Sequence, residues 1–417
     1  MAPAAGLSAV ARRRDRSQHR RSAELRSARP RPHLDPERVD RHQAARSRPD
    51  TRRDRRRGSP RTRAHRCARP PRGHEHVVRF TVRTVDVHLE VPFQISRAVR
   101  TEKRVVLVEL EEGARISRGE ASPDPFFKET TESLEAEVRG SLDLVPEDAA
   151  DLATLKLRLD ERFPHGGAAA CALDILGHDR AAQSAGVPLR TFLGLAGREA
   201  PPTSFTIGIA EPHVMAERAA AAAAKGFGVL KVKLGHGDAD VEVLSRIRER
   251  FAGTIRVDPN AAWTPAEAPA RIERIARFDI EFVEQPTPTE DIDGLRYVRE
   301  RSELPIVADE AAVRLPHVER LSGACDGINV KLQKCGGIAE ARAMIARAHD
   351  LGMKVMLGCR AAETSVAIAA AAHLAPSVEW ADLDGNLLIV DDPFRAVPVV
   401  NGRFVFSDRP GLGAVPA

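Results

Sequence analysis

From residue 203 onward the sequence repeats one pattern eight times, and this regularity constrains the fold more than any other feature. Each repeat begins with a short apolar run and continues into an Ala- and Arg-rich stretch of helical character. The eight runs are FTIGI, LKVKL, TIRVDP, EFVEQP, PIVADE, GINVKL, KVMLG and VEWADLD. Marker residues within them, from Thr206 to Asp382, lie 22 to 27 residues apart, which corresponds to one strand and one helix per step.

Alternating strands and helices imply parallel strands joined by right-handed crossovers, and eight such units close into a barrel. An open doubly wound sheet is the alternative architecture. A dinucleotide-binding sheet of that kind would need a Gly-rich first turn, yet no G-x-G-x-x-G follows any of the eight runs. We therefore predict an α/β fold, a modified (β/α)8 barrel of the TIM type in (β/α)7β form.

The residues before the barrel predict a smaller α+β domain. Two β-rich runs, VVRFTVRTVDVHLEV and RVVLVELEE, suggest an antiparallel hairpin with a long loop over residues 92–103. Helical patterns follow to about residue 190, including the apolar AAACALDILGHDRAAQSAG, which ends at Gly186. Strands followed by helices are typical of an α+β unit.

Residues 1–76 differ from everything that follows. They contain 23 Arg, 8 acidic residues, no Lys, and no Ile, Phe, Tyr or Trp, so we expect this segment to be disordered. A basic arm that binds nucleic acid is one interpretation. The absence of Lys instead resembles out-of-frame translation of GC-rich DNA, so we expect a misassigned start and a protein that begins near Val77.

The composition indicates in which cellular compartment the protein is expected to act. The five cysteines are scattered without paired spacing, which indicates neither a disulfide framework nor a zinc cluster and fits a reducing cytoplasm. No apolar run reaches the roughly 18 residues of a spanning helix, and no secretory signal is present. We expect a soluble, cytoplasmic protein without a membrane partner.

Three acidic residues close three successive strands: Asp258, Glu284 and Asp309. Barrel enzymes place catalytic groups at these strand ends, and three converging carboxylates require a cation to neutralise them. The hard oxygen ligands favour Mg²⁺, whereas zinc would call for His or Cys. Pairing of each acid with a surface Lys or Arg is the alternative, which the matched spacing disfavours.

Two lysine-bearing strands belong to the same pattern. Lys231 and Lys233 stand two apart on one strand, so both side chains face the barrel interior. Near a metal and a second cation a lysine pKa falls, and Lys233 is our candidate for a base near pH 7. Lys331 ends a strand across the barrel mouth and could address the opposite face of a carbon centre. Solvated lysines on an amphipathic strand are the alternative for both.

Four further residues complete the predicted site. Asn260, two residues after Asp258, and Glu310, directly after Asp309, could orient ligands or Lys331, or else cap helices. Asp382 and Asp384, again two apart, lie at the last strand's end, away from the metal strands, and could hold a cationic group such as an ammonium. A turn is the alternative for the pair, because Asp before Gly is common in loops.

With these motifs the chain resembles the enolase superfamily, in particular the dipeptide epimerases (L-Ala-D/L-Glu epimerase type) of its muconate lactonizing subgroup. The resemblance spans about residues 78–410. The motifs are KVK at 231–233, VDPN at 257–260, VEQP at 283–286, ADE at 308–310, NVKLQKCGG at 329–337 and DLDG at 382–385.

The resemblance implies roles for the predicted residues. The three strand-end acids would hold Mg²⁺, which binds the substrate carboxylate. Lys233 and Lys331 would be the two acid/base catalysts of a 1,1-proton transfer through a metal-stabilised enolate, and Lys231 would stabilise the carboxylate. Asp382 and Asp384 would bind the α-ammonium of a dipeptide. Enzymes of this superfamily use a Lys or His base together with Mg²⁺ that stabilises an ene-diolate.

The resemblance also implies an organisation. Residues 77–200 would form a capping domain whose loops, about 93–104 and at PDPFFKET, close over a barrel at 201–385, and residues 386–417 would return to the cap. A homo-oligomer is implied as well. One departure stands out: GCRAAETS carries one residue more than usual before its Glu, so Arg360 could enter the pocket and favour an acidic second residue.

Three other functions stay open at this point. Muconate cycloisomerases and o-succinylbenzoate synthases, the latter with N-acylamino acid racemase activity, share the metal and lysine motifs. An arginine-rich nucleic-acid-binding protein is the alternative from another class. The Asp-x-Asp on the last strand favours a small-molecule dipeptide as the substrate.

Overall fold

The computed structural model describes residues 78–95, 98–235 and 237–417. The predictions for residues 1–76 therefore lie outside the described residues. Eight parallel strands form one sheet in the order β11-β10-β9-β8-β7-β6-β5-β4. A parallel bridge between Thr203 and Ala381, with the Ser204 amide 3.1 Å from the Ala381 carbonyl, brings the two edges together. The predicted barrel is confirmed.

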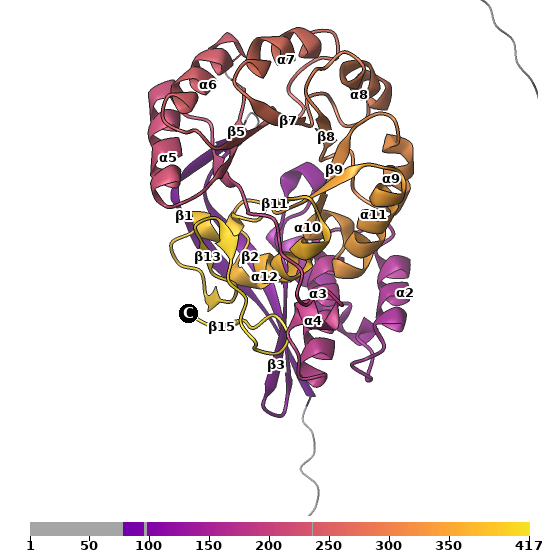
Figure 1. Ribbon diagram of the computed structural model, residues 1–417. Helices are drawn as coiled ribbons and strands as arrows, with labels where there is room; N and C mark the ends of the chain where they lie inside the picture. The colour runs from indigo at the N-terminus through magenta and orange to yellow at the C-terminus, as the bar shows by residue number, and fades with distance from the viewer. Residues whose placement is uncertain (1–77, 96–97, 236) are drawn as a thin grey trace, which may run out of the picture. The chain divides into compact units, whose positions relative to one another are not determined.

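Every predicted barrel strand is present. The strands are β4 (Phe205–Ile207), β5 (Val229–Lys233), β6 (Thr254–Asp258), β7 (Ile280–Glu284), β8 (Ile306–Ala308), β9 (Gly327–Lys331), β10 (Lys354–Gly358) and β11 (Trp380–Asp382). The helices that connect them are α5 (Pro212–Ala224), α6 (Asp240–Arg248), α7 (Ala268–Ala276), α8 (Ile292–Arg299), α9 (Leu315–Leu321), α11 (Ile338–Asp350) and α12 (Ser365–Leu374), with the short α10 (Leu332–Cys335) between β9 and α11. Figure 1 shows most of these helices as an outer ring around the strands.

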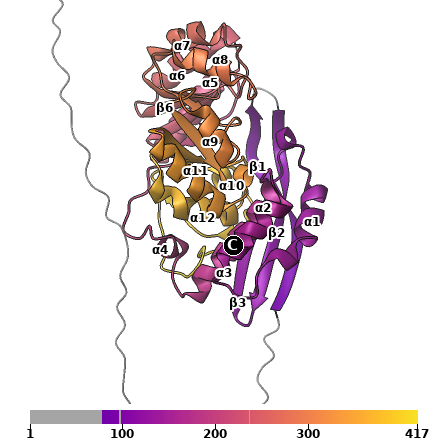
Figure 2. The same ribbon diagram turned by 90° about the vertical axis from the view of Figure 1, so that its right-hand side faces the viewer.

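A three-stranded antiparallel sheet precedes the barrel, made of β1 (Val78–Ile95), β2 (Ala98–Glu112) and β3 (Arg115–Ala121). The helices α1 (Thr131–Arg139), α2 (Leu152–Arg162), α3 (Ala168–Ser184) and α4 (Leu189–Phe192) follow it. Figure 2 shows this sheet as a layer beside the barrel. We call residues 78–192 the cap.

The predicted long hairpin loop over residues 92–103 is wrong. β1 continues to Ile95 and pairs with β2 up to Ala98. The ladder is interrupted instead by a register shift between His88 and Phe93. Pro92 falls inside this shift, where its missing N–H costs no ladder hydrogen bond, so a residue that suggested a loop is accommodated within a strand.

Helix α3 lies between the cap sheet and the barrel (Figure 2). Every residue from Ala168 to Ala182 is buried, which is expected only of a helix covered on all sides. Its residues Cys171 and Ile175 belong to the barrel core, whereas Leu173 and Leu176 belong to the cap core. One helix therefore fills part of both hydrophobic cores.

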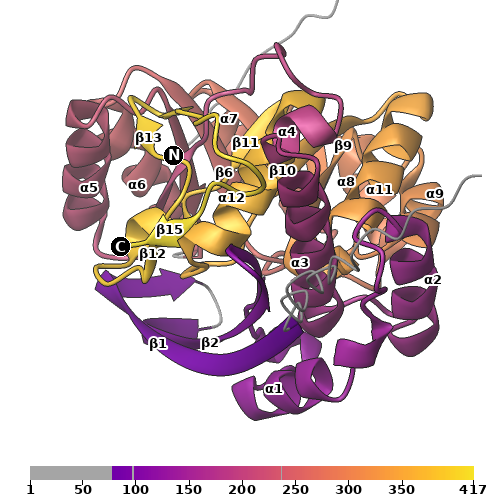
Figure 3. The same cartoon turned by 90° about the horizontal axis from the view of Figure 1, so that it is seen from below.

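The end of the chain runs back to the cap, as Figure 3 shows from below. Its short strands are β12 (Phe394–Arg395), β13 (Val399–Val400), β14 (Arg403–Phe404) and β15 (Val415–Pro416). The Val390 amide donates to the His88 carbonyl at 2.9 Å, and Arg118 donates to the Ala414 carbonyl at 3.1 Å. Among the described residues no helix is long and apolar enough to cross a membrane.

Candidate active site

The carboxyl ends of β6, β7 and β8 bring three carboxylates together. Asp258 and Glu284 end their strands, and Asp309 follows Ala308 directly. One oxygen from each carboxylate lies within 4.8 Å of the other two, and all three side chains are buried. Adjacent parallel strands in matched register force this convergence, as the sequence predicted.

Lys231 lies at the centre of this group. Its ammonium nitrogen is 2.7 Å from Glu284 Oε2, 3.1 Å from Asp258 Oδ2 and 2.9 Å from Asp382 Oδ2. Lys231 is only 2% exposed, so these carboxylates take the place of water around its charge. We expected Asp382 and Asp384 to lie away from the strands that carry the metal-site acids. Asp382 instead lies close to them, because the Lys231 ammonium contacts Asp382 as well as Asp258 and Glu284.

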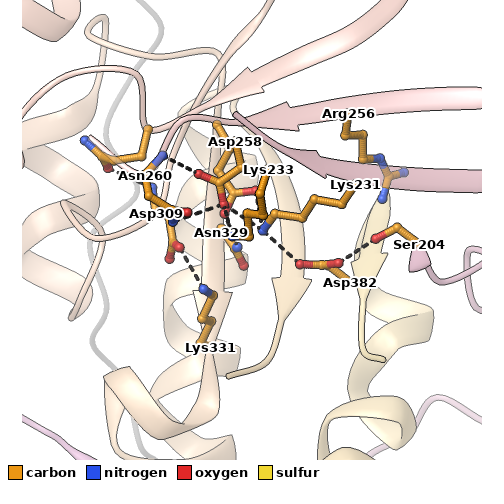
Figure 4. Close-up of polar contacts among 12 residues, drawn as sticks. Ser204, Lys231, Lys233, Arg256, Asp258, Asn260, Asp309, Asn329, Lys331 and Asp382 are labelled. Atoms are coloured by element: carbon orange, nitrogen blue, oxygen red, sulfur yellow. Dashed lines mark hydrogen bonds and ion pairs between the residues drawn. The ribbon is translucent and has the colours of Figure 1, made fainter. Parts of the chain in front are cut away.

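The other two predicted lysines flank the carboxylates. Lys233 Nζ lies 2.6 Å from Asp258 Oδ2, and Lys331 Nζ lies 2.7 Å from Asp309 Oδ2. Figure 4 shows the two side chains approaching from opposite sides of the carboxylate group. Both line one cavity of about 530 Å³, which is within the usual size of small-molecule sites.

The three carboxylates differ in their affinity for a proton. Burial raises the pKa of Asp258, but Lys233 and Lys231 outweigh it and bring that pKa to about 2. The pKa of Asp309 falls well below its usual range, since Lys331 and Lys334 together outweigh burial. Burial, and then the charge of Asp258, raises the pKa of Glu284 to about 8. A divalent cation bound among the three carboxylates would favour the ionised form of Glu284.

Burial lowers the pKa of Lys331, but the neighbouring Asp309 outweighs burial and raises it above its ordinary value. A lysine near a metal and a second cation is expected to have a lowered pKa. Lys331 does not, because Asp309 lies next to it. A cation bound to Asp309 would weaken this stabilisation, because the carboxylate would then be shared.

Asn260 donates two hydrogen bonds to the Asp258 carboxylate. Its backbone amide donates to Asp258 Oδ1 at 2.8 Å, and its side-chain amide donates to Oδ2 at 3.3 Å. Asn260 has a φ of +49°, a conformation that Asn tolerates better than most residues. Glu310 is buried and lines the same cavity near Lys331.

Two polar residues of the site were missed. Asn329 donates from Nδ2 to Glu284 Oε1 at 2.8 Å, and Lys334 Nζ lies 2.7 Å from Asp309 Oδ1. The signal for Asn329 was its position two residues before Lys331, which places both side chains on one face of β9. Lys334 lies in the short helix α10 (Leu332–Cys335), and its contact depends on a turn that no strand period predicts.

Asp382, which ends β11, and Asp384, two residues beyond it, line the same cavity on its other side. Ser204 Oγ donates to Asp382 Oδ1 at 2.5 Å, and the Thr206 amide donates to Asp384 Oδ2 at 2.6 Å. Burial, and then the charge of Asp382, raises the pKa of Asp384 to about 7. For Asp382, Lys231 outweighs burial and the pKa is lowered. Two buried carboxylates that repel each other can accept a cationic group.

Arg360 reaches the cavity wall, but the cap already engages its guanidinium. Its Nη1 donates to Glu129 Oε2 at 2.6 Å and to the Ser122 carbonyl. Glu363 Oε1 accepts the Arg360 amide at 2.6 Å and so does not cap the following helix. Thr364 is the cap of α12 instead, with its side chain accepting the Val366 amide.

Comparison with known proteins agrees with this geometry. The mandelate racemase/muconate lactonizing enzyme N-terminal domain model matches residues 78–194, and the enolase C-terminal domain-like model matches residues 214–417. The L-Ala-D/L-Glu epimerase of Bacteroides thetaiotaomicron is 39% identical over 339 residues, which cover 81% of this chain and 88% of that protein. The hydrophobic dipeptide epimerase of Enterococcus faecalis is 35% identical over 320 residues, or 73% of this chain and 89% of that one.

Solved structures give the same result. The dipeptide epimerase of Enterococcus faecalis, complexed with Mg and L-Leu-L-Tyr, has a TM-score of 0.76 at 32% identity and covers 80% of this chain and 98% of that chain. The substrate-liganded L-Ala-D/L-Glu epimerase of Bacillus subtilis has a TM-score of 0.77 at 28% identity, with 82% and 99% covered. The chain therefore belongs to the mandelate racemase/muconate lactonizing enzyme family of the enolase superfamily.

Proposed function

We propose that the protein is a Mg²⁺-dependent dipeptide epimerase that inverts the α-carbon of the C-terminal residue of its substrate. The observation that carries this proposal is one cavity lined by Lys233, Lys331, Asp309 and the pair Asp382 and Asp384, with Asp258 and Glu284 buried against Asp309. A dipeptide has a carboxylate and an ammonium at its two ends, and the cavity offers a site for each. The names of the relatives support the same conclusion.

Asp258, Glu284 and Asp309 would hold the metal. The donor set fits Mg²⁺, since all three ligands are hard oxygens and their repulsion already demands a cation. When bound, Mg²⁺ supplies positive charge that stabilises the substrate carboxylate as its α-proton leaves. Lys231, fixed between these carboxylates and Asp382, would add a second positive charge beside the same substrate group.

Lys233 and Lys331 would exchange protons with the α-carbon from its two faces. Their positions on opposite sides of the carboxylates support this assignment. One lysine removes the proton as a base, and the other, in its ammonium form, returns a proton from the opposite side. Inversion follows because the two faces are served by different groups.

Asp382 and Asp384 would bind the α-ammonium of the N-terminal residue. Their mutual repulsion, seen in the raised pKa of Asp384, would be relieved by a cation placed between them. Arg360 would lie beside the side chain of the C-terminal residue. Its guanidinium already lies 2.6 Å from Glu129 Oε2 and 4.0 Å from Asp124 Oδ2, so an acidic substrate side chain would share it with these cap carboxylates.

Proton exchange in D₂O tests the proposal. With Mg²⁺ and a panel of dipeptides, we expect deuterium at the α-carbon of the C-terminal residue and formation of the second epimer, followed by mass spectrometry and NMR. Lys233→Met and Lys331→Met should each retain exchange with only one epimer, and the two variants should differ in which one. Absence of exchange on every dipeptide would refute the function and favour a cycloisomerase or o-succinylbenzoate synthase.

We also propose that the enzyme acts in the cytoplasm as a homo-oligomer and without nucleic acid. The resemblance to its family supports the oligomer. Analytical ultracentrifugation of the purified chain tests the assembly, and a single species at the monomer mass would contradict it.

A further inference from the structure

A second cavity, of about 220 Å³, adjoins the proposed ammonium site. Phe93, Thr206 and Leu388 line both cavities, so the two meet along a shared wall. Thr206 is also the residue whose amide donates to Asp384 Oδ2 at 2.6 Å. The second cavity therefore begins at Thr206, the residue that is hydrogen-bonded to Asp384 of the proposed ammonium site.

The walls of this second cavity come from three elements. Strand β4 and Gly208 form one wall, the stretch of β1 from Leu89 to Phe93 forms another, and helix α5 contributes a third. Most of these side chains are apolar. The charged residues that line the cavity are Glu90, Arg218 and Lys225.

Backbone hydrogen bonds tie one end of the β1 wall to the barrel and the other end to the C-terminal segment. The Ile209 amide donates to the Gln94 carbonyl at 2.8 Å, and the Val390 amide donates to the His88 carbonyl at 2.9 Å. Between these ties lies the register shift of the hairpin, where residues 89–92 leave the ladder with β2. The cavity thus occupies space opened by this shift.

Resting on the proposed function, we propose that this cavity binds the side chain of the substrate's N-terminal residue and selects an apolar one. The substrate carboxylate at the metal and the ammonium at Asp382 and Asp384 fix the direction of the dipeptide. The side chain of the N-terminal residue branches from the carbon that carries the ammonium, so it must leave next to Thr206. Arg218 and Lys225, with only Glu90 opposing them, disfavour a cationic side chain.

A panel of dipeptides with one constant C-terminal residue tests the proposal. With Ala, Leu or Lys as the N-terminal residue, we expect the highest kcat/KM for Leu and the lowest for Lys. Equal kcat/KM across the panel, or preference for Lys, would overturn the proposal. If no dipeptide exchanges its α-proton at all, the proposed function itself fails, and that outcome is distinct.

A filled cavity gives the sharper test. Ala221 is exposed on α5 and lines the cavity, so Ala221→Leu narrows it without disturbing the core. We expect kcat/KM for the Leu-first dipeptide to fall about tenfold or more, while the Ala-first dipeptide changes less than about twofold. Ala224→Leu is the matched control, because Ala224 is exposed on the same helix and does not line the cavity. Equal loss on both dipeptides, or no loss on either, would overturn the proposal.

Discussion

The ammonium nitrogen of Lys231 lies 2.9 Å from Asp382 Oδ2, and this contact joins the two halves of the cavity. The same nitrogen is 2.7 Å from Glu284 Oε2 on the metal side. A single buried cation thus balances charge at both ends of the proposed substrate site. A change in charge at Asp382 therefore alters the electrostatic environment of Glu284 through Lys231, and the reverse holds as well.

Lys231→Met tests this arrangement. We expect kcat/KM to fall about 100- to 1,000-fold, because a fixed positive charge beside the reacting carboxylate is lost. Mg²⁺ should bind more tightly to the variant, since Lys231 competes for Glu284 and Asp258. Calorimetry with Mg²⁺ and the deuterium exchange assay measure the two effects. Lys354→Met, at the opposite end of a barrel strand, is the control; weaker Mg²⁺ binding in Lys231→Met would contradict the prediction.

Asn329→Leu should weaken Mg²⁺ binding. The 2.8 Å hydrogen bond from Asn329 holds Glu284 Oε1, and loss of a group that orients a ligand costs about 10- to 100-fold in metal affinity. Calorimetric titration with Mg²⁺ gives the Kd. Asn386→Leu, which removes an amide bonded to Ser365 Oγ outside the metal site, should leave that Kd unchanged. An unaltered Kd in Asn329→Leu would show that Glu284 needs no such support.

Gly119→Ala should destabilise the whole protein. A Cβ at Gly119 would lie 1.9 Å from the Ala172 carbonyl oxygen of α3, so the helix or the strand must shift. Overpacking of this kind costs about 1–3 kcal/mol, and here the obstacle is backbone. Urea unfolding followed by circular dichroism gives the free energy of unfolding. Gly228→Ala meets no atom within 4 Å and should change that free energy by less than about 0.5 kcal/mol.

His373 should make the folded state sensitive to acid. Burial lowers its pKa from 6.5 to about 4, and its Nδ1 accepts the Arg190 amide at 3.2 Å, which requires a neutral ring. Because the folded-state pKa is depressed, the contribution to stability is full above pH 6.5 and is lost as the pH falls towards 4. The loss amounts to about 3 kcal/mol.

His373→Gln checks this linkage, since Gln does not titrate. The free energy of unfolding, measured from pH 7 to pH 4, should fall less steeply in the variant than in the unchanged protein. The two proteins are compared by the slope of the free energy of unfolding against pH. A variant with lower absolute stability therefore still tests the linkage. Parallel curves would contradict the prediction.

The barrel and its site were predictable because both depend on short-range periodicity. The spacing from Thr206 to Asp382 indicated eight strands, and the strand ends placed the carboxylates and lysines at one mouth of the barrel. Lys231 and Lys233 share a face simply because they stand two residues apart. No tertiary information was needed for these positions.

Other features depended on contacts between distant segments. Pro92 suggested a loop, whereas the register shift in the hairpin allows it to stay within a strand. Arg360 was expected to enter the pocket and does line the cavity, but local pattern did not predict that Glu129, 231 residues earlier, pairs with its guanidinium. Lys334 was missed because its contact with Asp309 follows from a helical turn after β9. Such pairings cannot be read from local pattern.

The position of helix α3 in both hydrophobic cores affects how the protein unfolds and where substitutions can be tolerated during evolution. Because Cys171 and Ile175 complete one core and Leu173 and Leu176 the other, neither layer retains its packing without the same helix. We expect a single cooperative unfolding transition for residues 78–417 rather than two. The hairpin end near Phe93 and the segment around Phe127 line the cavity without belonging to either of those cores. New substrate preferences can therefore arise in these segments at little cost to folding.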